Sequence, residues 1–179
     1  TIKNKIKLPI SVKLSRYYTN PLGIIAKMDQ LGVEGFVLFN KLFQPDIDIS
    51  SEKHSTPWNL STPEEVRLPL RYAGLLYGKT NADIISSTGI YTSNEVIKVL
   101  LAGADSVQIV STIYKNGINQ VKTILSGLEQ WMDDKNYQSI DDFRGKLSLK
   151  NTSNPFVFKR AQYIDLILNS DKYLNNTLV

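Results

Sequence analysis

Four times along this chain a short apolar run is followed by a segment with helical periodicity. The apolar runs cover residues 9–15, 35–40, 82–88 and 106–112, and the helical patterns cover residues 20–32, 65–78, 93–104 and 118–135. Repeated strand–helix units imply parallel strands joined by right-handed crossovers. At this level a doubly wound sheet and a barrel look alike. A complete (β/α)8 barrel needs about 250 residues, so a chain of 179 has room for roughly half of one.

Local signals mark some of the element boundaries. Asn20 is a predicted cap for the first helix, and Ser93 is the predicted cap for the third. Residues 44–64 are polar and rich in turn-forming residues, so we expect a loop there. Two shorter helices are predicted around residues 139–145 and 155–169.

Composition argues against several kinds of site. The chain has no cysteine, which excludes disulfides, thiolate catalysis and cysteine-ligated metals, and His54 is its only histidine. The net charge of +4 is small, and no stretch mixes dense basic residues with aromatic ones. We therefore expect no nucleic-acid partner and no metal. No run is long enough to span a bilayer and nothing resembles a signal peptide, so a cytoplasmic protein without a membrane partner is expected.

In α/β folds the functional residues lie at the carboxyl ends of the parallel strands. Those ends carry Lys13, Asn40, Thr88, Gly89, Ser111 and Thr112. Lys13 stands at the centre of an apolar strand, where burying an unpaired ammonium costs several kcal/mol. It is therefore expected either to pair with a carboxylate inside a barrel or to meet an anionic or polarised ligand group. Asn40 either caps the following loop or presents its amide to a ligand.

The stretch ISSTGIYTSNEV, residues 85–96, ends a strand on small residues and restarts as a helix. An ordinary strand-to-helix turn and an anion site both fit this pattern. The next strand ends similarly in VST, residues 110–112, so several backbone N–H groups can approach one anion. Each helix that follows would add the positive end of its dipole. The two endings together favour a phosphate site.

Four stretches carry a family resemblance: PISVKLSRYYTN, GVEGFVLFNKLFQPDID, STGIYTSNEVIKVLLAGADSVQIVSTIYKNG and GLEQWMDDKNYQSIDDFRGKLS. Between about residues 8 and 165 the chain resembles the C-terminal half of dihydroorotate dehydrogenase, most closely a dihydroorotate-dehydrogenase-like subgroup. The resemblance implies an FMN-dependent (β/α)8 TIM barrel. Residues 1–179 would form a single domain with roughly strands five to eight of that barrel. The implied activity is an oxidoreductase that oxidises dihydroorotate to orotate in pyrimidine biosynthesis.

The resemblance also implies the site residues. Its cofactor, FMN, is expected to contact Lys13, Phe39, Thr88, Gly89, Ile90, Ser111 and Thr112. In the family, the lysine of this set contacts the flavin ring and the two later strand ends bind the phosphate. The small-molecule substrate, similar to dihydroorotate, is expected at Asn40 and Lys41.

The chain departs from the family pattern at several of these positions. Lys41 stands where dihydroorotate enzymes have Ser or Thr, and residues 61–72 lack the family's glycine-rich loop. Thr88 and Ser111 replace glycines, although both still offer a backbone N–H group. These changes favour retention of FMN over retention of dihydroorotate specificity.

The catalytic base of the family, a Cys or Ser after strand four, would lie in an N-terminal half for which this chain has no segment. The chain starts at Thr1, and we interpret it as part of a longer protein, with little or no dehydrogenase activity on its own. The expected partners are the missing half of the barrel and a second copy in a homodimer. Two alternatives stay open: an FMN-binding barrel with another or no redox substrate, and a non-catalytic half-barrel that acts by association.

Overall fold

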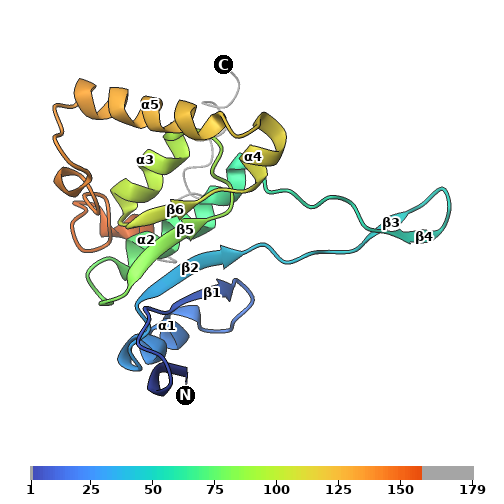
Figure 1. The fold of residues 1–179 in the computed structure, drawn as a ribbon, viewed down its shortest axis with the longest axis horizontal. Coiled ribbons are helices and arrows are strands. Elements are labelled where there is room, and N and C mark those ends of the chain that lie inside the picture. Colours follow the sequence, from blue (N-terminus) through green and yellow to red (C-terminus); the bar gives the residue numbers. More distant parts are fainter. Residues whose placement is uncertain (1, 159–179) are drawn as a thin grey trace.

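A computed structural model describes residues 2–158 of the 179-residue chain. At its centre lies a four-stranded sheet with the order β1-β2-β5-β6 (Figure 1). The strands are β1 (Ser11–Ser15), β2 (Gly35–Asn40), β5 (Asp83–Ser87) and β6 (Ser106–Gln108). All three neighbouring pairs are parallel, which confirms the predicted α/β arrangement.

Helices lie between successive strands of the sheet and follow its last strand. The α-helices are α1 (Pro21–Gln30), α2 (Arg67–Leu76), α3 (Ser93–Ala102), α4 (Ser111–Asn116) and α5 (Gln120–Asp134). The single 3₁₀ turns are η1 (Ile2–Asn4), η2 (Pro63–Val66), η3 (Ile140–Asp142) and η4 (Pro155–Phe158). In Figure 1, α2 and α3 pack side by side and α5 lies against α3.

The two helix caps predicted from the sequence have different outcomes. Asn20 caps α1, because its side-chain oxygen accepts a hydrogen bond from the N–H of Gly23 at 3.0 Å. The predicted cap at Ser93 is wrong by one residue. Thr92 caps α3 and accepts from the N–H of Asn94 at 3.2 Å, and Glu95 completes a reciprocal capping box.

The two faces of the sheet differ. Successive strand residues point to opposite sides of a sheet. Leu14, Phe36, Leu38 and Ile84 point toward the helices and are at most 2% exposed. Burial of a side chain of this size contributes about 1.5–3 kcal/mol. Lys13 points to the opposite face and is exposed, so the expected burial of its ammonium is wrong for this chain.

The last strand is shorter than predicted. Residues 106–112 were expected to be extended, but β6 ends at Gln108, and Ser111 and Thr112 form the first turn of α4. The chain leaves the sheet at Val110, whose φ of −136° and ψ of −60° are not those of a strand. Its carbonyl oxygen accepts hydrogen bonds from two following amides, which closes the first helical turn.

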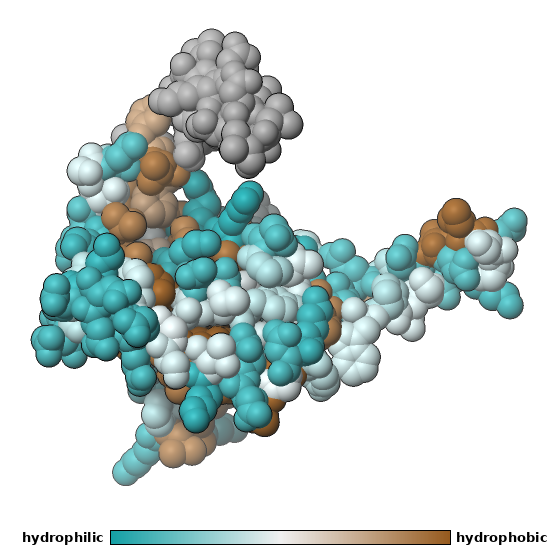
Figure 2. Space-filling view, turned by 90° about the horizontal axis from the view of Figure 1, so that it is seen from above, coloured by the Kyte–Doolittle hydropathy of each residue, from teal (hydrophilic) through white to brown (hydrophobic). Residues whose placement is uncertain are grey.

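The segment predicted as a polar loop contains a β-hairpin. Strands β3 (Asp46–Asp48) and β4 (Lys53–Ser55) pair in antiparallel fashion. This hairpin stands clear of the body of the molecule (Figure 1), and its tip exposes apolar side chains (Figure 2). Ile47 is 60% exposed and Ile49 is 87% exposed. Strands of three residues, mostly polar, are too short to produce the alternation that predicts a strand.

The C-terminal part agrees with the sequence only in part. The helix predicted at residues 118–135 is confirmed as α5, whereas residues 139–145 contain only the turn η3. The helix predicted at residues 155–169 begins with η4, and its remainder lies outside the described residues. Within residues 2–158, every helix is too short or too polar to cross a membrane.

Candidate functional site

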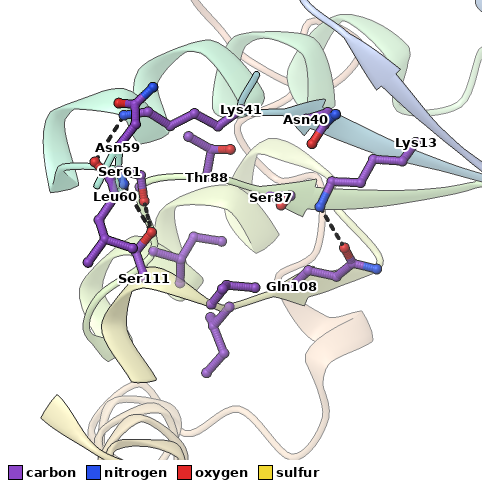
Figure 3. Close-up of a pocket in the computed structure, with 14 residues that line it drawn as sticks. Lys13, Asn40, Lys41, Asn59, Leu60, Ser61, Ser87, Thr88, Gln108 and Ser111 are labelled. Carbon is purple, nitrogen blue, oxygen red and sulfur yellow. Dashed lines mark hydrogen bonds between the residues drawn. The ribbon is translucent and has the colours of Figure 1, made fainter. Parts of the chain in front are cut away.

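A cavity of about 210 Å³ opens at the carboxyl ends of the strands (Figure 3). It is lined by Lys13, Asn40, Lys41, Asn59, Leu60, Ser61, Ser87, Thr88, Gly89, Ile90, Gln108, Ile109, Val110 and Ser111. The lining therefore contains two lysines and, among the described residues, no Asp or Glu side chain. Lys41 is paired with Glu65, so it is the charge of Lys13 that favours an anionic ligand.

The loop after β5 brings three successive backbone N–H groups to this cavity. Thr88 and Gly89 have left-handed conformations, with φ of +86° and +76°. The Thr88 hydroxyl holds the loop by donating to the carbonyl oxygen of Phe39 at 2.9 Å. Apart from the pairing of β5 with β6, the N–H groups of Thr88, Gly89 and Ile90 donate no hydrogen bond to another residue in the described range 2–158. Successive amides without an acceptor, at the wall of a cavity, are typical of an anion site.

Close packing requires glycine at position 89. A Cβ atom there would overlap the amide nitrogen of Val66 and lie 2.8 Å from the carbonyl carbon of Glu65. The loop after β5 is therefore pressed against the backbone of the segment from Thr62 to Val66, and this segment forms part of the cavity's surroundings.

The ending of the next strand contributes differently from the prediction. Ser111 lines the cavity, and its Oγ accepts hydrogen bonds from the N–H and from the hydroxyl of Ser61, each at 2.9 Å. The N-terminus of α4 has no side-chain cap, so its first amides are open to a ligand. Thr112 is fully buried and bonds to the carbonyl oxygen of Tyr91 at 3.1 Å, so its side chain supports the loop from outside the lining.

The N-terminus of α3, whose dipole was predicted to meet a phosphate, already has a partner within the chain. The Glu95 carboxylate accepts from the N–H of Thr92 at 2.9 Å and from its hydroxyl at 2.7 Å. A carboxylate therefore stands at the N-terminus of α3, where the sequence predicted that a phosphate would meet the dipole. That part of the prediction is wrong, and the free amides of residues 88–90 are the donors instead.

Lys13 reaches from β1 to β6 on the face of the sheet opposite Leu14 and Phe36. Its Nζ donates to Oε1 of Gln108 at 3.2 Å (Figure 3). The carboxylate partner considered from the sequence is therefore absent among the described residues, and no Asp or Glu of the lining lies beside the ammonium. Gln108 was not predicted. It stands two residues after Ser106, so the two side chains share one face of the last strand, and this spacing was the available signal.

Lys41 is held within the chain. Its Nζ donates to the carbonyl oxygen of Leu60 at 3.0 Å and pairs with Oε2 of Glu65 at 2.7 Å. Burial raises the pKa of Glu65, but hydrogen bonds from Lys41 and from Thr62, with the charges of Lys41 and Arg16, outweigh it and hold this pKa below its ordinary value of 4.5. Glu65 was also missed, although the spacing of Thr62 and Glu65 is that of a capping box.

The other predicted contacts lie on two sides of strand β2. Asn40 lines the cavity and is half-buried. The ring of Phe39 is buried and packs edge-on against Tyr72, with ring centroids 4.9 Å apart, so it faces the helix layer instead. Only the carbonyl oxygen of Phe39 is linked to the site, through Thr88.

Taken together, the donors suit a phosphate group. The amides of residues 88–90 and the start of α4 lie at the same cavity and can meet an anion, and the lining offers no described carboxylate to repel it. The phosphate of FMN is such an anion, so the residues present fit this cofactor.

Comparisons with known proteins identify similar chains. The sequence model of the family described as dihydroorotate dehydrogenase matches residues 1–132. The catalytic subunit of dihydroorotate dehydrogenase B (NAD(+)) from Thermoplasma acidophilum is 29% identical over 147 residues, covering 80% of this chain and 48% of that protein. The corresponding subunit from Desulforamulus reducens is 27% identical over 151 residues, covering 83% of this chain and 49% of that protein. The chain thus spans about half the length of the curated relatives it matches.

A solved structure extends the comparison to the fold. The crystal structure of ligand-free DHODH from Eimeria tenella has a TM-score of 0.61 and 20% sequence identity, covering 75% of this chain and 39% of that chain. At this identity the likeness concerns the fold alone. It confirms the predicted fold class: the parallel sheet and its helices are part of a TIM barrel.

Proposed function

Because the chain belongs to the dihydroorotate dehydrogenase family, we propose that it is the FMN-binding C-terminal half of an oxidoreductase barrel, carrying roughly strands five to eight. The observation that supports this most directly is the set of amides at residues 88–90 that line the same cavity as Lys13, which has no carboxylate partner within residues 2–158. The relatives are named for oxidation of dihydroorotate, and a dihydroorotate-like molecule is the proposed substrate.

In this proposal each part of the cavity has one task. FMN, when bound, supplies the two-electron redox chemistry. The amides of residues 88–90 and the first turn of α4 hold its phosphate. Lys13 places a positive charge near the ring, where it would offset negative charge on the reduced flavin. The side-chain amide of Asn40 contacts the substrate at the same edge of the sheet.

The remainder of the barrel completes the site. Strands β1 and β6 both have an open edge within the described sheet, and four further strand–helix units would close the barrel there. We propose that the catalytic base lies in that other half and that the 179-residue chain alone turns over no dihydroorotate. We also propose that the complete protein is a cytoplasmic homodimer.

One observation favours a second candidate, a flavoprotein with another or no redox substrate. Lys41 stands beside the proposed substrate contact Asn40, but it is committed to Glu65 and to the Leu60 carbonyl oxygen. The position that the family uses for a hydroxyl next to the substrate therefore offers a ligand neither a hydroxyl nor a free cation.

Two measurements test the proposal. Purified protein should carry, or take up, FMN with the absorbance of a bound flavin; absence of flavin binding would leave the non-catalytic half-barrel as the remaining interpretation. Dihydroorotate-dependent reduction of an electron acceptor by the complete protein would separate the first candidate from the second. Turnover by the isolated 179-residue chain would contradict the assignment of the base to the other half.

A further inference from the structure

The segment from Asn59 to Val66, here called the wall segment, forms one side of the cavity. It carries Asn59, Leu60 and Ser61 of the lining, and it runs on into η2. The segment contains no glycine, and contacts with other elements hold its backbone against the loop after β5.

Three sets of contacts fix the wall segment. Ser61 is bound at its N–H and hydroxyl by Ser111, and its carbonyl oxygen accepts from the hydroxyl of Tyr91. The backbone near Val66 touches Gly89 directly. Between these points, the ammonium of Lys41 joins the carbonyl oxygen of Leu60 to the carboxylate of Glu65, as Figure 3 illustrates for the Leu60 end.

The ion pair between Lys41 and Glu65 lies in the part of the wall segment that packs against the loop after β5. The Oε2 atom that Lys41 contacts at 2.7 Å also accepts from the N–H of Thr62 at 2.8 Å. Lys41 and Glu65 each have only 22% of their side chains exposed, so the pair is shielded more than a surface salt bridge. A single cation thus ties together both ends of a short turn whose backbone abuts Gly89.

From these contacts we infer that Lys41 and Glu65 are positioning residues for the phosphate end of the cavity. Their pair seats the wall segment on the loop of residues 88–90, and through it sets the direction of the amides that bind the anion. This inference rests on the proposed function for the identity of the ligand, and it assigns Lys41 a task other than contact with the substrate.

The test compares two ligands that differ only in the phosphate. In the whole purified protein, Lys41→Met should weaken FMN binding about tenfold, because a charge-assisted hydrogen bond is lost, and should leave riboflavin affinity within about twofold. Lys41→Arg, which keeps a cation for Glu65, should retain most of the FMN affinity. Lys98→Met is the matched control, since Lys98 is an exposed lysine on α3 without an ion pair to another described residue.

A double-substitution cycle tests whether the two residues act as one unit. The variant with both Lys41→Met and Glu65→Leu should bind FMN no more weakly than either single variant, because each already breaks the pair. Multiplicative losses would overturn the inference. So would an equal loss of FMN and riboflavin affinity, which is expected of general destabilisation, or no loss of either.

A measurement without ligand separates this inference from the proposed function. In the ligand-free protein, Lys41→Met should speed amide hydrogen exchange at Ser61, Thr62 and residues 88–90, while α5 keeps the wild-type rate. If wild-type protein binds no FMN, the proposed function fails, and exchange still decides the positioning role. Unchanged exchange at these amides would overturn it.

Discussion

At the scale of single residues, two constraints at position 89 require glycine: a positive φ and a backbone neighbour too close for a Cβ atom. The φ of Gly89, +76°, is unfavourable for L-residues, and a Cβ would overlap the backbone at Val66. Gly117 shares only the first constraint, with φ of +80° and no atom within 4 Å of a built Cβ. The pair of glycines therefore separates the cost of backbone strain from the cost of a clash.

We expect Gly89→Ala to lower the free energy of unfolding by about 3 kcal/mol or more, because strain and overpacking add. Gly117→Ala should cost about 1 kcal/mol from strain alone. Urea unfolding of the two variants measures the difference. Equal losses would mean that the wall segment yields easily to a methyl group at position 89. Gly89→Ala should also weaken FMN binding, whereas Gly117→Ala should not.

The carboxylate of Glu65 makes stability depend on pH. Its pKa in the folded chain lies below the ordinary value of 4.5, since the hydrogen bonds and charges of its partners outweigh burial. A lowered folded pKa means that its stabilising contribution is complete above the unfolded pKa and is lost as the pH falls through the folded value. The stability advantage of wild type over Glu65→Gln should therefore be largest near neutral pH and vanish in acid. Urea unfolding at a series of pH values measures it.

The control for this pH series is Glu129→Gln on α5. Glu129 is exposed and makes no ion pair or hydrogen bond with another described side chain. Its replacement should change the free energy of unfolding little at any pH. An advantage for wild type over Glu65→Gln that persisted unchanged into acid would contradict the role assigned to the ionised Glu65.

At the scale of elements, the N-terminus of α3 is capped by the chain's own side chains and is therefore not available to a ligand. Thr92 and Glu95 satisfy its first amides, and Glu95 is buried to 9% exposure beside the cap. The α4 terminus has no side-chain cap, although it follows the neighbouring strand. Two helices in equivalent positions of the sequence pattern thus differ in their ability to meet an anion.

We expect Thr92→Ala to destabilise the protein by about 1 kcal/mol, because it removes the cap of α3. FMN affinity should stay close to wild type, since the amides at residues 88–90 rather than this terminus bind the phosphate. Asn94→Ala is the control, because it keeps the backbone N–H of residue 94, which donates to the Thr92 hydroxyl. Urea unfolding and flavin titration give both readings; a large loss of FMN affinity in Thr92→Ala would restore the α3 terminus as part of the anion site.

At the scale of the whole molecule, the described sheet has two open edges, β1 and β6. Unpaired strand edges are templates for association with other strands. We expect the isolated 179-residue chain to associate as its concentration rises, as measured by sedimentation velocity. A charge on each edge, in the variant Ser11→Lys with Ser106→Lys, should reduce this association. Ser126→Lys on the exposed face of α5 should not, and equal effects would show that net charge rather than the edges controls association.

The sequence was sufficient to predict the elements that depend on long, regular patterns. The helix-covered strands β2 and β5 and the helices α1 and α5 carry enough apolar periodicity or capping chemistry to be recognised locally. The hairpin of β3 and β4 was missed because its three-residue strands are stabilised by pairing with each other rather than by a buried face. The end of β6 was misjudged because residues that suit a strand also suit the first turn of α4.

The sequence by itself determined the order of strands and helices, the small residues after β5 and the exclusion of cysteine chemistry. Only the tertiary structure decided which groups meet in space. Lys13 and Gln108 are 95 positions apart, and Ser61 and Ser111 are 50 apart, so no local pattern links them. The same holds for Lys41: the family resemblance suggested a substrate contact, and only the folded chain brings it to Glu65, because partners across a turn depend on where the backbone goes.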